Sequence, residues 1–229
     1  MNPALLVLSI PVLIFAIVFH ECAHGWMANR LGDPTAKLMG RITLNPIPHV
    51  DIFGTILIPL FLLITNSSFM FGYAKPVPVD YRNLRDPHKD MLWIGLAGPL
   101  ANIILMFISA IIWKLMIVTS GQYAGYTILD KLQVSYRITQ PLIGMIQYSV
   151  LINMVLAIFN LIPIPPLDGS RIVMGLLPPD LAEPYSRIEP YGFFIIIALF
   201  MTGTFTHLVG PMFTGMQRIL SFFHLWPHY

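Results

Sequence analysis

Residues 4–27, ALLVLSIPVLIFAIVFHECAHGWM, decide how this chain folds. The run carries no charged side chain as far as Phe19. At about 1.5 Å per residue it reaches roughly 36 Å, which is enough to cross a hydrocarbon core of about 30 Å. The sequence therefore predicts a transmembrane helix over Ala4 to Met27 with polar residues at its C-terminal end.

The end of this helix reads His20-Glu21-Cys22-Ala23-His24, the HExxH pattern. At 3.6 residues per turn, the two histidines lie on one face, where both imidazoles can reach one metal ion. A catalytic zinc takes three protein ligands and a water, and a neighbouring carboxylate can move that water's proton to a leaving amine. We therefore expect His20 and His24 to be metal ligands and Glu21 to be the general base. The alternative is a helix end whose polar side chains only reach the lipid headgroups.

The composition indicates a membrane protein. Of the 229 residues, 56% are hydrophobic and 10% are charged, whereas soluble domains have about 25% charged residues. We predict an all-α polytopic membrane protein with residues 1–229 in a single domain, which excludes a large soluble domain. The net charge of +2 gives no signature of nucleic-acid binding, and the sequence carries no pattern that specifies an oligomeric state.

About four to six transmembrane helices are expected. After the first, spans are predicted over Met91 to Val118 and Pro141 to Leu161, and apolar helices follow over 191–225, broken by Gly203 and by Gly210-Pro211. Basic residues follow the first helix and none precedes it. By the positive-inside rule, the N-terminus is then outside the plasma membrane and the motif faces the cytoplasmic side.

Two further segments lack the pattern of a full transmembrane helix. Ile52 to Thr65 is short for a span and contains Gly54 and Pro59, so a re-entrant segment is expected there. Leu38 to Asn45 alternates loosely and favours a short membrane-associated strand or hairpin, to whose edge an extended substrate could add. A plain connecting loop is the alternative.

A proline-rich run, NLIPIPPLDG over 160–169, supplies a candidate third ligand. Its three prolines cannot remain helical, and irregular backbone at membrane depth must be buried or line a cavity. Asp168 then lies at the depth of the two histidines, provided that the Ile52 to Thr65 segment does not cross the membrane. Asp168 could instead cap a helix over Ser170 to Leu177. The third ligand could also be Glu183 or Glu189.

The next predicted span, Met91 to Val118, begins with small residues that allow another helix to approach closely. Asn102, near its start, is expected to hydrogen-bond to another helix, which is a structural role.

Taken together, the His20–His24 motif, the GPLAN stretch over 98–102 and the 160–169 run resemble the site-2 protease family of intramembrane zinc metalloproteases. FGYAKPVPV over 71–79 is similar to its short prokaryotic members, and neither PDZ nor regulatory nucleotide-binding CBS modules are recognisable. The resemblance implies a catalytic core over about 4–177, with C-terminal apolar helices over 191–225. It also implies one zinc ion held by His20, His24 and Asp168, with Asn160 assisting substrate or oxyanion binding.

An intramembrane zinc metalloendopeptidase is therefore the expected function. Such enzymes cut transmembrane helices of other membrane proteins in regulated intramembrane proteolysis. The expected partners are a substrate helix and the lipid bilayer, with no nucleic acid. A non-proteolytic membrane metal-binding protein or a metal transporter that uses the same residues is the alternative.

Overall fold

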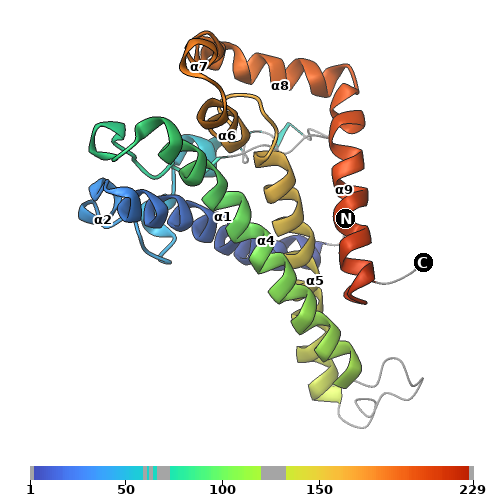
Figure 1. Cartoon of the computed structure of the whole chain (residues 1–229). Coiled ribbons are helices and arrows are strands. Elements are labelled where there is room, and N and C mark those ends of the chain that lie inside the picture. Colours follow the sequence, from blue (N-terminus) through green and yellow to red (C-terminus); the bar gives the residue numbers. More distant parts are fainter. Residues whose placement is uncertain (1–2, 59–60, 62–63, 66–72, 120–132, 227–229) are drawn as a thin grey trace.

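A computed structural model describes residues 3–58, 61, 64–65, 73–119 and 133–226 (Figure 1). The longer helices are α1 (Pro3–Leu31), α4 (Pro87–Thr119), α5 (Gln133–Asn160) and α9 (Thr204–Phe222). The shorter ones are α2 (Thr35–Leu38), α6 (Asp168–Leu176), α7 (Pro179–Ser186) and α8 (Gly192–Met201). Short helical turns cover Ile47–His49, Ile52–Leu57, Tyr81–Asn83 and Glu189–Tyr191. Every regular element in these ranges is helical.

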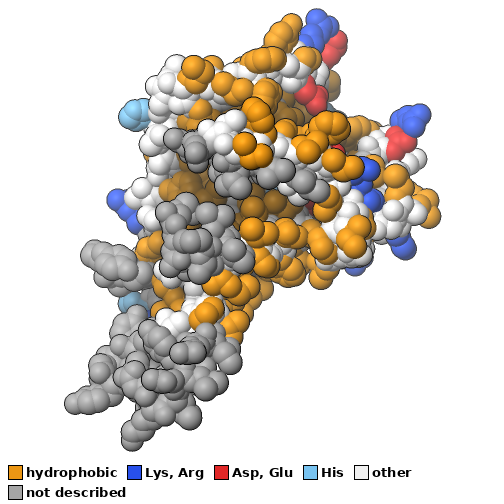
Figure 2. Space-filling model, turned by 180° about the vertical axis from the view of Figure 1, so that it is seen from behind, with side chains coloured by type: hydrophobic (Ala, Val, Ile, Leu, Met, Phe, Trp, Pro, Cys, Tyr) orange, Lys and Arg blue, Asp and Glu red, His pale blue; other side chains and the backbone are white. Residues whose placement is uncertain are grey.

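Three helical segments are long and apolar enough to cross a membrane: Leu8–Leu31, Pro87–Thr119 and Thr139–Asn160. A fourth span is present if the bent pair Pro179–Met201 and Thr204–Phe222 is counted as one. The described residues thus give three or four candidate spans, at or below the low end of the four to six expected. Figure 2 shows hydrophobic side chains over much of one face, with charged side chains toward its edge.

Proline affects these helices less than the sequence predicted. Helix α5 already begins at Gln133 and continues through Pro141. Helix α9 continues through Pro211, so the break expected at Gly210-Pro211 is absent. The break falls at Gly203, whose φ of 71° suits glycine, and the chain turns there by 86°. In Figure 1 this turn is the corner between α8 and α9.

The strand expected over Leu38 to Asn45 is wrong. Residues 39–40 form a turn, in which Gly40 has a φ of 64°, and residues 42–44 form bends. Local bonds replace strand pairing, since the hydroxyl of Thr43 accepts from the backbone of Asn45, and the Asn45 side chain accepts from Ile47 N–H. Such local side-chain bonds compete with sheet formation. The loop alternative is confirmed.

Only part of the predicted re-entrant segment is described. Ile52–Leu57 forms a wide helical turn, and the Asp51 carboxylate accepts from the N–H of Gly54 at its start. Residues 59–60 and 62–63 lie outside the described residues. The re-entrant course of Ile52 to Thr65 stays a prediction.

Helix α4 is the central element, since it packs against α1, α5 and α6. The main core lies where α4, α5 and α9 meet, and its most buried side chains include Met106, Val150, Met154 and Leu220. The predicted close approach at the small residues of α4 is confirmed. A Cβ on Gly95 would lie 3.0 Å from the carbonyl oxygen of Asp168. This contact sets the start of α6 directly against α4.

Candidate metal centre

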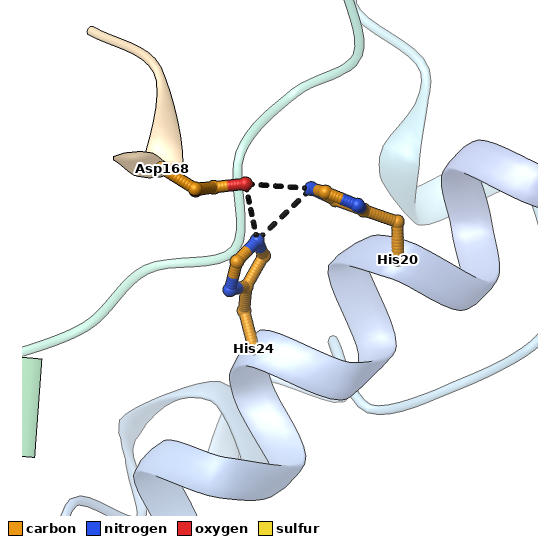
Figure 3. A group of neighbouring side chains, drawn as sticks. All are labelled: His20, His24 and Asp168. Atoms are coloured by element: carbon orange, nitrogen blue, oxygen red, sulfur yellow. Dashed lines mark hydrogen bonds and ion pairs between the residues drawn. The ribbon is translucent and has the colours of Figure 1, made fainter. Parts of the chain in front are cut away.

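His20, His24 and Asp168 point toward one another across the gap between α1 and the start of α6 (Figure 3). The Nε2 atoms of the two histidines are 3.0 Å apart. Oδ2 of Asp168 lies 3.0 Å from Nε2 of His20 and 3.2 Å from Nε2 of His24. All three side chains are buried. Among the described residues, this is the one group of three or more His, Cys, Asp or Glu side chains with metal-ligand spacing.

The other ring nitrogen of each histidine has a hydrogen-bond acceptor. Nδ1 of His20 lies 2.6 Å from Oδ1 of Asn102, and Nδ1 of His24 lies 2.6 Å from the carbonyl oxygen of Ile94. A carbonyl oxygen can only accept, so Nδ1 of His24 carries the proton. The Asn102 amide is oriented by its own Nδ2, which donates to the carbonyl of Ala16. In the neutral rings both Nε2 atoms are then lone-pair acceptors.

Three acceptors therefore face one buried point, which calls for a cation. Oδ2 of Asp168 is buried and has no hydrogen-bond partner among the described residues. Ligand atoms of a tetrahedral zinc with bonds of about 2.0–2.1 Å are roughly 3.3 Å apart, close to the spacing found here. Gly98 leaves room for a metal ion between these ligand atoms, because a Cβ on this residue would lie 2.6 Å from Nε2 of His20. The residues present fit a zinc ion.

Asp168 is the first residue of α6, yet it does not cap the helix. Leu167 is the N-cap of this helix, and the described structure has no side-chain cap hydrogen bond there. The turns over 161–167, which the prolines impose, direct the carboxylate toward α1 instead. The rival ligands lie elsewhere, since Glu183 pairs with Arg187 at 2.8 Å and Glu189 is exposed.

Glu21 is held by a backbone group from a distant loop. Its Oε2 accepts a hydrogen bond of 2.8 Å from the N–H of Val77. Val77 lies in segment 73–80, which is neither helix nor strand. The segment passes α1 next to the motif, and the Val77 side chain is buried there. The sequence did not reveal this contact, because a backbone N–H has no residue-type signature.

A buried polar chain extends from the cluster into the helices. Asn102 Nδ2 donates to Oδ1 of Asn153 at 2.8 Å, and Asn153 Nδ2 donates to the carbonyl of Ser149 at 2.8 Å. The hydroxyl of Ser149 lies 2.8 Å from that of Ser109. The interhelical bond expected for Asn102 is confirmed, but its contact with His20 was missed. A polar side chain inside an apolar helix was the available signal.

Asn160 is not joined to the cluster by any described contact. Its side-chain amide donates to the carbonyl of Leu156 in the same helix. The other described histidines do not belong to the cluster. His49 and His88 bond to the backbone carbonyls of Thr43 and Leu177, and His207 and His224 are exposed. His228 lies outside the described residues.

Comparison with known proteins agrees with this geometry. The family model for peptidase family M50 matches residues 8–203. The chain belongs to peptidase family M50. The resemblance to site-2 proteases is thereby confirmed, and the M50 family implies a zinc cofactor.

Two curated relatives of this M50 chain carry protease names. "Putative zinc metalloprotease YwhC" of Bacillus subtilis (strain 168) is 37% identical over 215 residues, covering 92% of this chain and 88% of the relative. "Putative zinc metalloprotease Rip2" of Mycolicibacterium smegmatis is 24% identical over 196 residues, covering 86% and 67%. No solved structure matches the chain.

The M50 protein is a zinc metallopeptidase of the membrane. Family membership gives the chemistry, and the long apolar helices give the setting. The transporter alternative loses its support, because both relatives are named as metalloproteases.

Proposed function

We propose that this protein is an intramembrane zinc metalloendopeptidase that hydrolyses peptide bonds within or near transmembrane helices of other membrane proteins. One observation carries the proposal. The acceptor cluster of His20, His24 and Asp168 is buried where a membrane-length helix meets α6, with a carboxylate beside it at Glu21. A substrate must then enter between helices of the protein to reach these groups.

His20, His24 and Asp168 would hold the zinc ion, one per chain. When bound, zinc would activate water and polarise the scissile carbonyl. Glu21 acts as the general base, taking a proton from the attacking water and delivering it to the departing amine. Asn160 remains a proposed contributor to substrate or oxyanion binding, which requires its amide to leave the carbonyl of Leu156.

The substrate class follows from the membrane setting. A helical substrate keeps its carbonyls in backbone hydrogen bonds, so the scissile region must unwind before attack. Helix-weakening Gly or Pro near the cleavage site is therefore expected. Regulated release of a signalling domain from such a substrate is the proposed physiological role.

The metal assignment is tested by the zinc content of purified full-length protein in detergent, compared with Asp168→Ala and Glu21→Gln. Stoichiometric zinc in the unmodified protein and in Glu21→Gln, with loss in Asp168→Ala, supports the three-ligand site. Zinc that survives Asp168→Ala contradicts the ligand assignment.

The substrate class is tested in proteoliposomes with synthetic single-span peptides that carry a central Gly-Pro pair. Mass spectrometry locates the products. A cut inside the apolar segment, absent with zinc-loaded Glu21→Gln, is the expected result. Cleavage restricted to soluble peptides such as casein fragments overturns the intramembrane assignment.

We propose the plasma membrane as the location, with the N-terminus outside and the site toward the cytoplasm. An impermeant maleimide applied to intact cells should label Tyr123→Cys but not Arg82→Cys, each in a Cys22→Ser background. The reverse pattern contradicts the orientation.

A further inference from the structure

The peptide group that joins Pro76 to Val77 contacts two charged side chains from opposite ends. Its N–H donates to Oε2 of Glu21 at 2.8 Å. Its carbonyl oxygen, that of Pro76, accepts from Nη2 of Arg41 at 3.2 Å. The same Nη2 atom donates to the carbonyl of Lys75 at 2.7 Å. One rigid, planar peptide therefore lies between a guanidinium and the general base.

Arg41 is an unusual cation for this position. It is 5% exposed, and its Nε is buried without a hydrogen-bond partner among the described residues. In the same part of the chain, no carboxylate lies within ion-pair distance of its guanidinium. A buried charge without a paired countercharge is costly. The carbonyl oxygens of Lys75 and Pro76, which accept hydrogen bonds from Nη2, partly offset the cost of burying this charge.

We propose that Arg41 is a positioning residue for the reaction, which fixes and polarises the Pro76–Val77 peptide so that its N–H holds the Glu21 carboxylate in place beside the metal ligands. This inference rests on the proposed role of Glu21 as general base.

From Arg41 through the Pro76–Val77 peptide to Glu21, each positive end faces a negative end. The positive guanidinium faces the negative end of the peptide dipole, and the positive N–H end faces the carboxylate. Hydrogen bonds in such a chain polarise one another, and this strengthens each bond in a low-dielectric site. Hydrogen bonds to a charged partner are also the stronger kind. The Arg41 charge thus acts on Glu21 without touching it.

Independent contacts hold the segment on both sides of this peptide. The N–H of Lys75 donates to the carbonyl of His49 at 2.9 Å. The Val77 side chain packs against α1, where a Cβ on Gly25 would lie 3.0 Å from Val77 Cγ1. The loop therefore keeps its course over α1 when Arg41 is replaced, and the orientation of the two peptides on either side of Pro76 is what changes.

Hydrogen exchange gives a readout that does not depend on activity. Because Val77 lies between Pro76 and Pro78, its amide is isolated from other exchanging amides. In zinc-loaded full-length protein in nanodiscs, the Val77 amide should exchange roughly tenfold faster in Arg41→Gln than in the unmodified protein. The Lys75 amide, bonded to His49, serves as the internal control and should change little. Glu21→Ala should accelerate Val77 as well.

Kinetics on a transmembrane peptide provide the second readout. A positioned general base contributes roughly 10²–10⁴-fold, so Arg41→Gln should lower kcat by about tenfold or more, with KM and zinc content unchanged. Arg41→Lys retains the charge and should recover a measurable part of kcat. Arg82→Gln is the matched control, because Arg82 is an exposed arginine paired with Asp80.

The outcomes separate the possible failures. Unchanged kcat and unchanged Val77 exchange in Arg41→Gln overturn the proposal. Equal kcat in Arg41→Lys and Arg41→Gln, with a lowered unfolding temperature in both, assigns Arg41 a purely structural role and also overturns it. Full activity in Glu21→Gln would instead refute the proposed function. If Arg41→Gln does not fold, Val77→Pro, which removes the N–H donor, should lower kcat with zinc retained, and unchanged kcat there counts against the proposal.

Discussion

The side-chain oxygen of Asn102 lies 2.6 Å from Nδ1 of His20, although 82 positions separate the two residues in the chain. This contact sets the tautomer of the histidine and turns its Nε2 toward His24 and Asp168. Metal-binding histidines usually have such a partner, which fixes ring orientation and raises basicity.

Replacing Asn102 should therefore weaken metal binding. Asn102→Ala removes the acceptor at Nδ1 and should lower zinc affinity roughly 10- to 100-fold. Competition with a zinc chelator measures the change. Asn153→Ala provides an intermediate case. It removes the acceptor of the Asn102 amide but leaves the contact between Asn102 and His20, so its effect on zinc affinity should be smaller. Equal affinities for all three proteins would refute the role of this contact.

Gly98→Ala should exclude the metal by occupying its place. The added methyl group would overlap both imidazoles, and overpacking of this kind should weaken zinc binding by roughly 10- to 100-fold. Zinc content and peptide cleavage should fall together. Gly144→Ala in α5 is the matched control, since a Cβ there meets no atom of the described residues within 4 Å. Normal zinc content in Gly98→Ala would show that the metal binds elsewhere.

The C-terminal helices should influence the site through Gly192, the first residue of α8. A Cβ on Gly192 would collide with the carbonyl oxygen of Pro165, in the turn that presents Asp168. Tyr185 of α7 also donates to the carbonyl of Pro163 in this turn. Gly192→Ala should lower zinc affinity. Gly210→Ala should not, because a Cβ there meets no atom within 4 Å in the described part of the chain. Titration of both variants with a zinc chelator measures the two affinities, and equal affinities would contradict the influence of α8 on the site.

Acid stability should depend on Asp33, which lies in the turn after α1. Burial alone would raise the pKa of Asp33, but hydrogen bonds from Thr35 and Asn83 hold it below its ordinary value. The backbone N–H of Asp80 adds a further bond to the same carboxylate. The folded protein thus binds this proton more weakly than the unfolded chain does. The stabilisation is present above about pH 4 and is lost as the pH falls through the folded pKa.

Thermal unfolding in detergent between pH 7 and pH 3 tests this dependence. Asp33→Asn should be less stable at pH 7, by about 1–3 kcal/mol for buried donors left poorly paired, and should lose less stability on acidification. Asp86→Asn, which removes an exposed pair with Lys89, should change the profile less. Parallel profiles for Asp33→Asn and the unmodified protein would contradict the prediction.

Several features could be predicted from residues alone because they follow from local periodicity or composition. Helical spacing puts His20 and His24 on one face, and the prolines over 160–169 end α5 and lead to Asp168. The predictions that were wrong also rested on local sequence patterns. Leu38 to Asn45 has strand-like residues but no partner strand in the described structure, so turn-forming side chains prevailed. Pro141 and Pro211 stayed inside helices because neighbouring helices can compensate for a lost bond in a membrane.

By itself, the sequence determined that this chain is an apolar helical protein of the metalloprotease type, with two histidines and a carboxylate on one helix. Tertiary structure alone decided that Asn102 orients His20, that Asp168 faces the histidines rather than capping α6, and that Val77 holds Glu21. The contacts of Asn102 and Val77 join residues 82 and 56 positions apart. Helix packing selects such pairs, and no local pattern encodes which backbone or amide group will meet a given side chain.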